Sequence, residues 1–105
     1  MKQKNAENPP EVRGQLANEQ FKLPKKLEQM QANPNGNYTI SDVGNICKKL
    51  GMELKSPKRG SHYKVFSELT LGPLTIPAKR PLKAVYIKEF IKLCSAHISK
   101  LNEGQ

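Results

Sequence analysis

The apolar positions of residues 39–50 recur at helical spacing between a clear start signal and a clear stop signal. Thr39 can cap a helix, with Asp42 as its capping-box partner three residues later. Gly51 follows directly, as glycine often does where a helix ends in a left-handed conformation. The sequence therefore predicts a helix over residues 40–50, with one apolar stripe made by Ile40, Val43, Ile46, Cys47 and Leu50.

Two further segments have helical spacing. Pro24 is a favourable first helical residue, Leu27 and Met30 follow it on one face, and the turn formers of residues 33–36 end the segment. We expect a short helix here that docks by one face. The segment after Pro81 predicts a long amphipathic helix, whose apolar positions are Ile87, Phe90, Ile91, Cys94, Ile98 and Leu101.

Three short segments between these helices alternate as strands do. They cover residues 52–56, 61–67 and 71–77, and turn chemistry separates the first two at residues 57–60. Three strands in succession predict an antiparallel meander, whose apolar side needs a cover. The fold class we expect is α+β, in the order α-β-β-β-α, with both helices packed on one face of the sheet and a short extra helix before them.

The first part of the chain has a different composition. Residues 1–22 carry scattered apolar side chains among Asn, Glu, Gln and two prolines, too few to offset the entropy of ordering them. We expect a disordered leader at 1–22 and a single domain at 23–105, which fits the 105 residues of the chain.

Positive charge is concentrated in the predicted domain. Residues 1–37 carry six cationic and four acidic side chains, a net charge of +2, whereas residues 38–105 carry 12 and five, a net charge of +7. A small domain with this excess has the electrostatic character of a nucleic-acid binder. The alternative is charge that serves only to keep the protein in solution.

Two cysteines, Cys47 and Cys94, lie within helical patterns and form no CxxC pair. We interpret them as buried free thiols of a reducing compartment, with no support for a disulfide or a zinc site. The first 20 residues contain no apolar run typical of a signal peptide, and no segment has the length of a membrane span. A cytoplasmic protein is expected.

The candidate chemistry centres on Gly60-Ser61-His62, at the start of the second predicted strand. An imidazole titrates near neutrality and can deprotonate a ribose 2′-hydroxyl or protonate a leaving oxygen, so His62 is a candidate for this chemistry. The alternative is a half-exposed polar residue that bonds a loop carbonyl, and the linked motifs described below favour catalysis. Gly60 permits a backbone conformation or close phosphate approach that a side chain would obstruct. Six cations can offset the negative charge that develops on the phosphorane. They are Lys58, Arg59 and Lys64 nearby in sequence, and Lys79, Arg80 and Lys83 before the last helix.

Other polar residues in this region have simpler interpretations. Ser61 lacks a neighbouring acidic residue to complete a serine-hydrolase arrangement with His62, so we expect it to be structural or to contact RNA. Alternation places Tyr63 on the opposite face from His62, which favours contact with the core or a partner over base stacking. His97 falls on a flank of the last helix, where packing or exposure is expected rather than catalysis.

The chain resembles the HicA toxins, small ribonucleases of bacterial type II toxin-antitoxin systems. The resemblance covers residues 27–101 and rests on linked features in the same order. These features are the turn Asn33-Pro34-Asn35-Gly36, the helix end Lys49-Leu50-Gly51, the strand Met52-Glu53-Leu54, the Gly60-Ser61-His62 tripeptide, and Thr75-Ile76-Pro77 followed by Pro81-Leu82-Lys83-Ala84-Val85-Tyr86-Ile87-Lys88.

The resemblance implies a fold like that of double-stranded-RNA-binding domains and metal-independent endonucleolytic cleavage of messenger RNA. The resemblance places the essential histidine at His62 and implies a reaction without a metal or other cofactor. It also implies a HicB-like antitoxin as protein partner. The RNA-binding candidates are then Lys58, Arg59, Gly60, Ser61, Lys64, Lys79, Arg80 and Lys83. For the cluster before the last helix, the alternative is a solvated basic end.

The chain departs from the family pattern at two places where many members carry further histidines. These places hold Tyr63 and the dipeptide Ala78-Lys79 here. Lys79 or a water would then supply the second proton transfer, and an inactive RNA-binding descendant is the alternative.

Two other classes of function compete with a ribonuclease. A non-catalytic double-stranded-RNA-binding module would have the same order of elements and a basic start to its last helix. Such modules usually open that helix with a run similar to Lys-Lys-x-Ala-Lys, whereas this chain has Lys79-Arg80-Pro81-Leu82-Lys83-Ala84, which favours the toxin family. A protein-interaction adaptor is the third and weaker hypothesis.

Overall fold

The computed structural model describes residues 23–70 and 72–103. The predicted leader at 1–22 lies outside these residues. The elements are α2 (Lys25–Ala32), α3 (Ile40–Leu50), β2 (Glu53–Lys55), β3 (His62–Phe66), β4 (Leu74–Pro77) and α4 (Ala84–Glu103).

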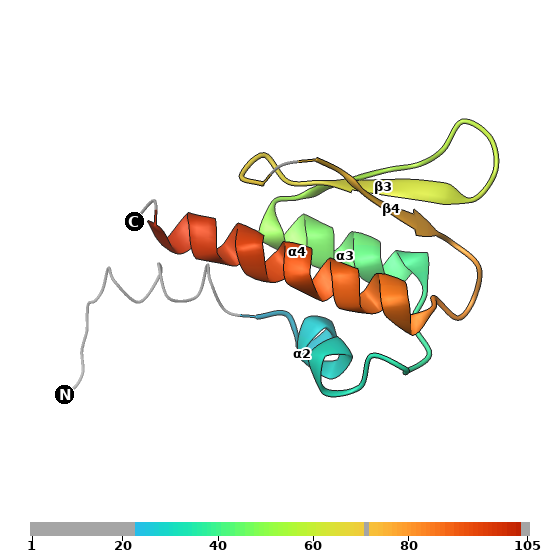
Figure 1. Cartoon of the computed structure of the whole chain (residues 1–105), viewed down its shortest axis with the longest axis horizontal. Coiled ribbons are helices and arrows are strands. Elements are labelled where there is room, and N and C mark those ends of the chain that lie inside the picture. Colours follow the sequence, from blue (N-terminus) through green and yellow to red (C-terminus); the bar gives the residue numbers. More distant parts are fainter. Residues whose placement is uncertain (1–22, 71, 104–105) are drawn as a thin grey trace.

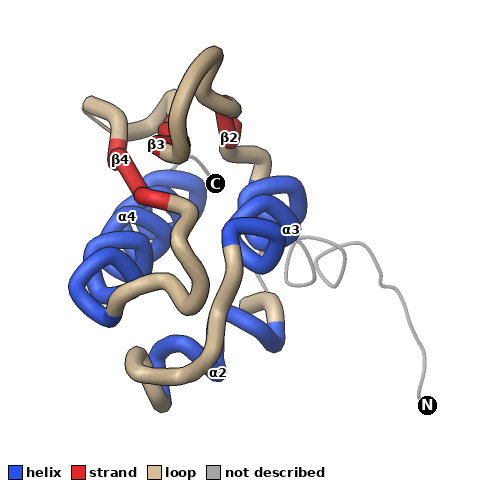
Figure 2. Tube along the Cα trace, turned by 90° about the vertical axis from the view of Figure 1, so that its right-hand side faces the viewer, coloured by secondary structure: helices blue, strands red, loops and turns tan. Residues whose placement is uncertain are grey.

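The elements form three layers. The strands make one antiparallel sheet in the order β2-β3-β4, which is the meander that the sequence predicts. Figure 2 shows the sheet on one side of α3 and α4, and α2 on the other side of these two helices. Figure 1 shows α4 running along the sheet in front of α3. The α+β class and the packing of both long helices on one face of the sheet are therefore confirmed.

The two faces of the sheet differ in burial, because neighbouring residues of a strand point to opposite sides. Val65 of β3 pairs with Leu54 and Leu74, and both Val65 and Ile76 are fully buried on the face that the helices cover. The opposite, open face carries His62, Lys64 and Phe66 of β3 together with Lys55 of β2 and Thr75 of β4. The Lys55 ammonium lies 5.1 Å from the centre of the Phe66 ring.

The core lies between the sheet and the pair α3 and α4, and it continues between this pair and α2 (Figure 2). Its largest fully buried side chains are Phe90, Leu27, Met30, Ile46, Ile76 and Ile87. Cys47 and Cys94 are buried free thiols, as predicted. Burial raises the pKa of the Cys47 thiol to about 11 and raises that of Cys94 further, so both stay protonated and unreactive near neutral pH.

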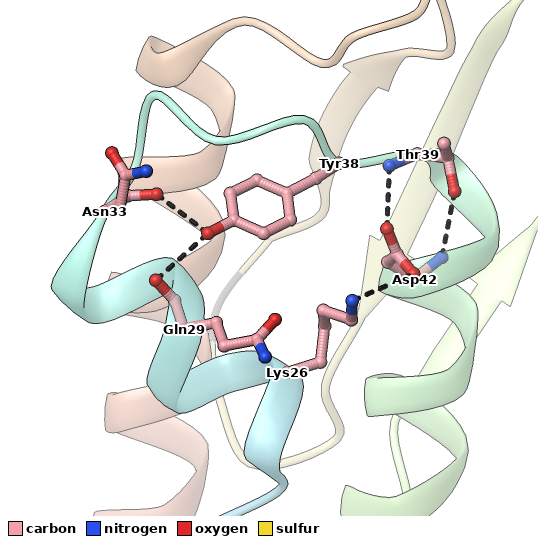
Figure 3. Close-up of polar contacts among 6 residues, drawn as sticks. All are labelled: Lys26, Gln29, Asn33, Tyr38, Thr39 and Asp42. Carbon is pink, nitrogen blue, oxygen red and sulfur yellow. Dashed lines mark hydrogen bonds and ion pairs between the residues drawn. The ribbon is translucent and has the colours of Figure 1, made fainter.

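The local signals at the ends of α3 act as the sequence predicts. The Thr39 hydroxyl accepts a hydrogen bond from the Asp42 amide at 3.4 Å, and the Asp42 carboxylate accepts one from the Thr39 amide at 3.0 Å (Figure 3). Lys26 of α2 approaches the same carboxylate at 4.0 Å. Gly51 ends the helix in the left-handed conformation with φ 77°. These contacts fix both ends of α3.

Tyr38 links α2 to the rest of the domain (Figure 3). Its hydroxyl donates toward the carbonyl oxygens of Gln29 at 3.0 Å and Asn33 at 2.8 Å, which lie in the last turn of α2 and just beyond it. Its own carbonyl accepts a hydrogen bond from the Leu82 amide at 2.9 Å. A Cβ atom on Gly36 would stand 2.8 Å from the Tyr38 ring, so only glycine leaves room for this ring.

We expect Tyr38→Phe to lower the free energy of unfolding by about 1 kcal/mol, because the Gln29 and Asn33 carbonyls each keep a backbone donor but lose the hydroxyl, while the ring stays in place. Urea unfolding followed by circular dichroism measures the loss. Tyr86→Phe is the matched control, since the Tyr86 hydroxyl has no hydrogen-bond partner among the described residues. Equal stability of the two variants would contradict the role given to the Tyr38 hydroxyl.

The observed elements are shorter than predicted at several ends. Pro24 has φ −60° and ψ 142° and precedes the first helical residue rather than being it. The strand expected at 71–77 begins at Leu74, because Gly72 has φ 74° and Pro73 has no N–H for the ladder. In the described part of the chain, no helix has both the length and the apolar character needed to cross a membrane.

Candidate nucleic-acid interface

The loop between β2 and β3 presents the first group of predicted site residues. Lys58, Arg59, Gly60 and Ser61 are all exposed. Gly60 has φ 80°, a left-handed conformation that glycine adopts without strain and other residues rarely adopt. The glycine of the tripeptide therefore shapes the turn that leads into β3.

His62 is the first residue of β3 and is exposed on the open face of the sheet. It stands opposite Pro77 of β4, and the Ala78 amide donates a hydrogen bond to the Ser61 carbonyl at 2.8 Å. Because Pro77 has no N–H, the His62–Pro77 pair is of the type without hydrogen bonds, in which the Cα atoms lie about 4.5 Å apart. The loops before His62 and after Pro77 are thus held side by side.

Three further predicted cations follow Pro77 in the chain. Lys79 and Arg80 lie in the loop after β4, and Lys83 directly precedes α4; all three are exposed. They line a pocket of about 470 Å³ at the N-terminal end of α4. The structure therefore brings the two predicted cationic segments to one end of the sheet, with His62 between them in the strand register.

Lys64 occupies a neighbouring row of the open face. It lies two residues after His62 on the same side of β3, opposite Lys55 and Thr75. An RNA backbone that crosses this face from Lys64 toward the loops would pass over His62. The exposed cations match the charge of phosphates, which carry most of the affinity in such complexes.

His62 has the accessibility that a proton-transfer group needs. Within the described part of the chain its side chain makes no hydrogen bond. Ser61 is exposed and its hydroxyl makes no bond to the imidazole, so the geometry contains no serine-hydrolase arrangement in this part of the structure. Tyr63 is half-buried on the helix-covered face opposite Ile76, as alternation predicted.

His97 has a structural environment instead. It is 3 % exposed, its Nε2 donates to the Leu50 carbonyl oxygen at 2.7 Å, and its Nδ1 lies 2.7 Å from the Ser67 hydroxyl. A carbonyl only accepts, so Nε2 carries the hydrogen and the Ser67 hydroxyl donates to Nδ1 in the neutral imidazole. Of the two expectations for His97, packing or exposure, the structure shows packing.

Sequence reasoning missed several residues of this region. Asn35, Gly36, Leu82 and Tyr86 line the pocket with the cations, although the sequence predicts a turn at residues 33–36 and no binding role for any of these four residues. No local signal points to them, because the pocket forms where this turn meets residues 77–86, some 40 positions later in the chain.

Residues 23–70 and 72–103 contain no group of three or more His, Cys, Asp or Glu side chains that could hold a metal ion. Comparison of the chain with protein-family models, with curated proteins and with solved structures finds no match in any of the three.

Proposed function

We propose that this protein is an endoribonuclease of the HicA kind, a messenger-RNA-cleaving toxin with a fold like that of double-stranded-RNA-binding domains. The observation that carries the proposal is the exposed His62 beside two cationic loops, which the Ala78–Ser61 hydrogen bond holds together. RNA cleavage needs a group that transfers a proton and a surface that binds phosphates, and an imidazole beside exposed cations can supply both.

The proposed reaction uses the ribose 2′-hydroxyl as its nucleophile. His62 accepts the proton of this hydroxyl as the 2′-oxygen attacks the adjacent phosphorus. The bond from phosphorus to the 5′-oxygen breaks, and this oxygen takes a proton from Lys79 or from a water. The products are a 2′,3′-cyclic phosphate and a 5′-hydroxyl, so atoms and charge balance with one proton accepted and one donated.

The cations act in binding and in charge compensation. Lys58, Arg59 and Lys64 approach the phosphate from the side of the β2–β3 loop, and Lys79 and Arg80 approach it from the loop after β4. Negative charge that develops on the phosphorus oxygens is stabilised by such preplaced cations. A HicB-like antitoxin that covers this end of the sheet would block the reaction in the cytoplasm.

A non-catalytic double-stranded-RNA-binding module is the second candidate. Two observations favour it: the imidazole of His62 has no orienting hydrogen bond within the described residues, and Tyr63 stands where many HicA members have another histidine. This alternative keeps the same cations, but it binds double-stranded RNA and performs no chemistry.

The two candidates differ in what happens to RNA. We expect the purified full chain to cleave messenger RNA in the presence of EDTA and to leave 2′,3′-cyclic phosphate ends, and its induction in bacteria to stop growth. The same RNA with 2′-O-methyl groups is the control and should stay intact, because it lacks the nucleophile. Tight binding of an unmodified RNA duplex without cleavage of any RNA would assign the binding module, and cleavage of the methylated RNA would contradict the proposed reaction.

A further inference from the structure

The pocket at the start of α4 is built from two segments that are distant in the sequence. Asn35 and Gly36 come from the turn after α2, and the remaining lining comes from residues 77–86 at the end of β4, the following loop and the first turn of α4. Its volume of about 470 Å³ lies within the range of small-molecule sites, about 300–1,000 Å³. A hollow site, and not only a basic surface, therefore lies at this end of the sheet.

The charge of the pocket selects an anion. Lys79, Arg80 and Lys83 line it, and no Asp or Glu lines it among the described residues. Lys83 also directly precedes α4, whose first-turn amides and dipole add to the attraction for negative charge. A phosphodiester matches this charge.

The remaining wall is apolar and includes an aromatic ring. Pro77, Pro81, Leu82, Ala84 and Tyr86 contribute to it. Unpaired RNA bases pack against such surfaces and stack on aromatic side chains. A free inorganic anion would gain nothing from this wall, whereas a nucleotide has both a charged group and a flat ring.

We infer that this pocket binds one nucleotide of single-stranded RNA, with its base on the apolar wall and its phosphate on the cations; the inference rests on the proposed ribonuclease function. Pro77 lines the pocket and is also the cross-strand partner of His62. The bound nucleotide is thus close to the phosphodiester that is cut. The pocket then holds this nucleotide beside the cleavage position through a stacking contact that accepts any base.

The test fills the pocket without changing its charge. Ala84→Leu adds bulk to the lining, and Ala96→Leu makes the same change at an exposed position of α4 outside the pocket. Both are made in the full chain with His62→Ala, so that RNA survives the measurement. The probes are a fluorescein-labelled uridine strand of about ten nucleotides, an abasic strand of the same length, and polyglutamate.

We expect Ala84→Leu to weaken binding of the uridine strand about tenfold, because the base loses its stacking surface, and to leave binding of the abasic strand unchanged. Ala96→Leu should bind all three probes like the parent protein. A second measurement uses the phosphate contact: Lys83→Ala should lower the slope of log Kd against log salt by about 0.7, whereas Lys88→Ala, outside the pocket, should not change it. Thermal melting checks that each variant is folded.

Each other outcome has a defined meaning. Equal binding of the uridine strand by folded Ala84→Leu and Ala96→Leu overturns the nucleotide pocket, and cleavage by the wild-type protein would show that the proposed function survives this failure. If Ala84→Leu weakens the binding of the abasic strand and of polyglutamate as much as that of the uridine strand, the base contributes nothing. The base site is then overturned, and the pocket is assigned to an acidic protein segment. If Ala84→Leu weakens binding of the uridine strand but the wild-type protein cleaves no RNA, the proposed ribonuclease function is overturned and the nucleotide pocket is kept.

Discussion

Replacement of His62 by alanine is expected to lower the rate of RNA cleavage by about a hundredfold to ten-thousandfold, the usual contribution of a positioned proton-transfer group. The side chain is exposed and makes no hydrogen bond within the described residues, so its removal should change the free energy of unfolding by less than about 0.5 kcal/mol. Single-turnover cleavage of a messenger-derived RNA by the purified full chain measures the first quantity, and urea unfolding measures the second.

Two controls separate a chemical role of His62 from a binding role. The imidazole is neutral in the proposed base form, so His62→Ala should bind 2′-O-methyl RNA with the wild-type Kd, whereas Arg59→Ala should bind it more weakly. Added free imidazole should restore part of the cleavage rate of His62→Ala and none of that of Arg59→Ala. Cleavage by His62→Ala at the wild-type rate would remove His62 from the mechanism.

Replacement of His97 by alanine is expected to lower the free energy of unfolding by about 3–4 kcal/mol. The substitution leaves a cavity in a buried position. It also removes the imidazole nitrogens that lie 2.7 Å from the Leu50 carbonyl oxygen and 2.7 Å from the Ser67 hydroxyl, so both groups lose a hydrogen-bond partner. For a domain of this size the melting temperature should fall by at least about 12 °C. Thermal and urea unfolding measure both quantities.

The chain has two histidines, so the same substitution can be compared at a buried and an exposed position. His62→Ala is the matched control for His97→Ala, and the pair should separate stability from cleavage. Ser67→Ala completes a cycle with His97→Ala, and their effects should fall short of additivity because the two side chains bond each other. A His97→Ala protein that melts like His62→Ala would contradict the structural role of the buried imidazole.

The ends of α3 could be predicted because the residues that determine them are local. Thr39, Asp42 and Gly51 act within a few positions of the helix. The strand ends depend on partners elsewhere in the chain: the strand predicted at 52–56 is reduced to Glu53–Lys55, since pairing with β3 extends only from Phe66 to Lys64. A single sequence contains no direct record of such register limits.

The same distinction applies to the candidate site. His62 and its neighbouring cations are candidates from the sequence because they lie close together in one motif, and the structure places the cations of residues 79–83 at the same end of the sheet. The pocket was not predicted because it joins Asn35 to residues 77–86. The bonds of His97 were not predicted either, since their partners lie 30 and 47 positions away.

Within residues 23–70 and 72–103, the two outer strands of the sheet offer little to a further strand. β2 has three residues, with charged and exposed Glu53 and Lys55 at its ends, and β4 has four and ends at Pro77, which has no N–H to donate. Short, charged or proline-ended edges are the features by which sheet proteins avoid pairing with one another. The consequence is resistance to edge-to-edge aggregation, so this domain should tolerate high concentration although half of its sheet surface is open.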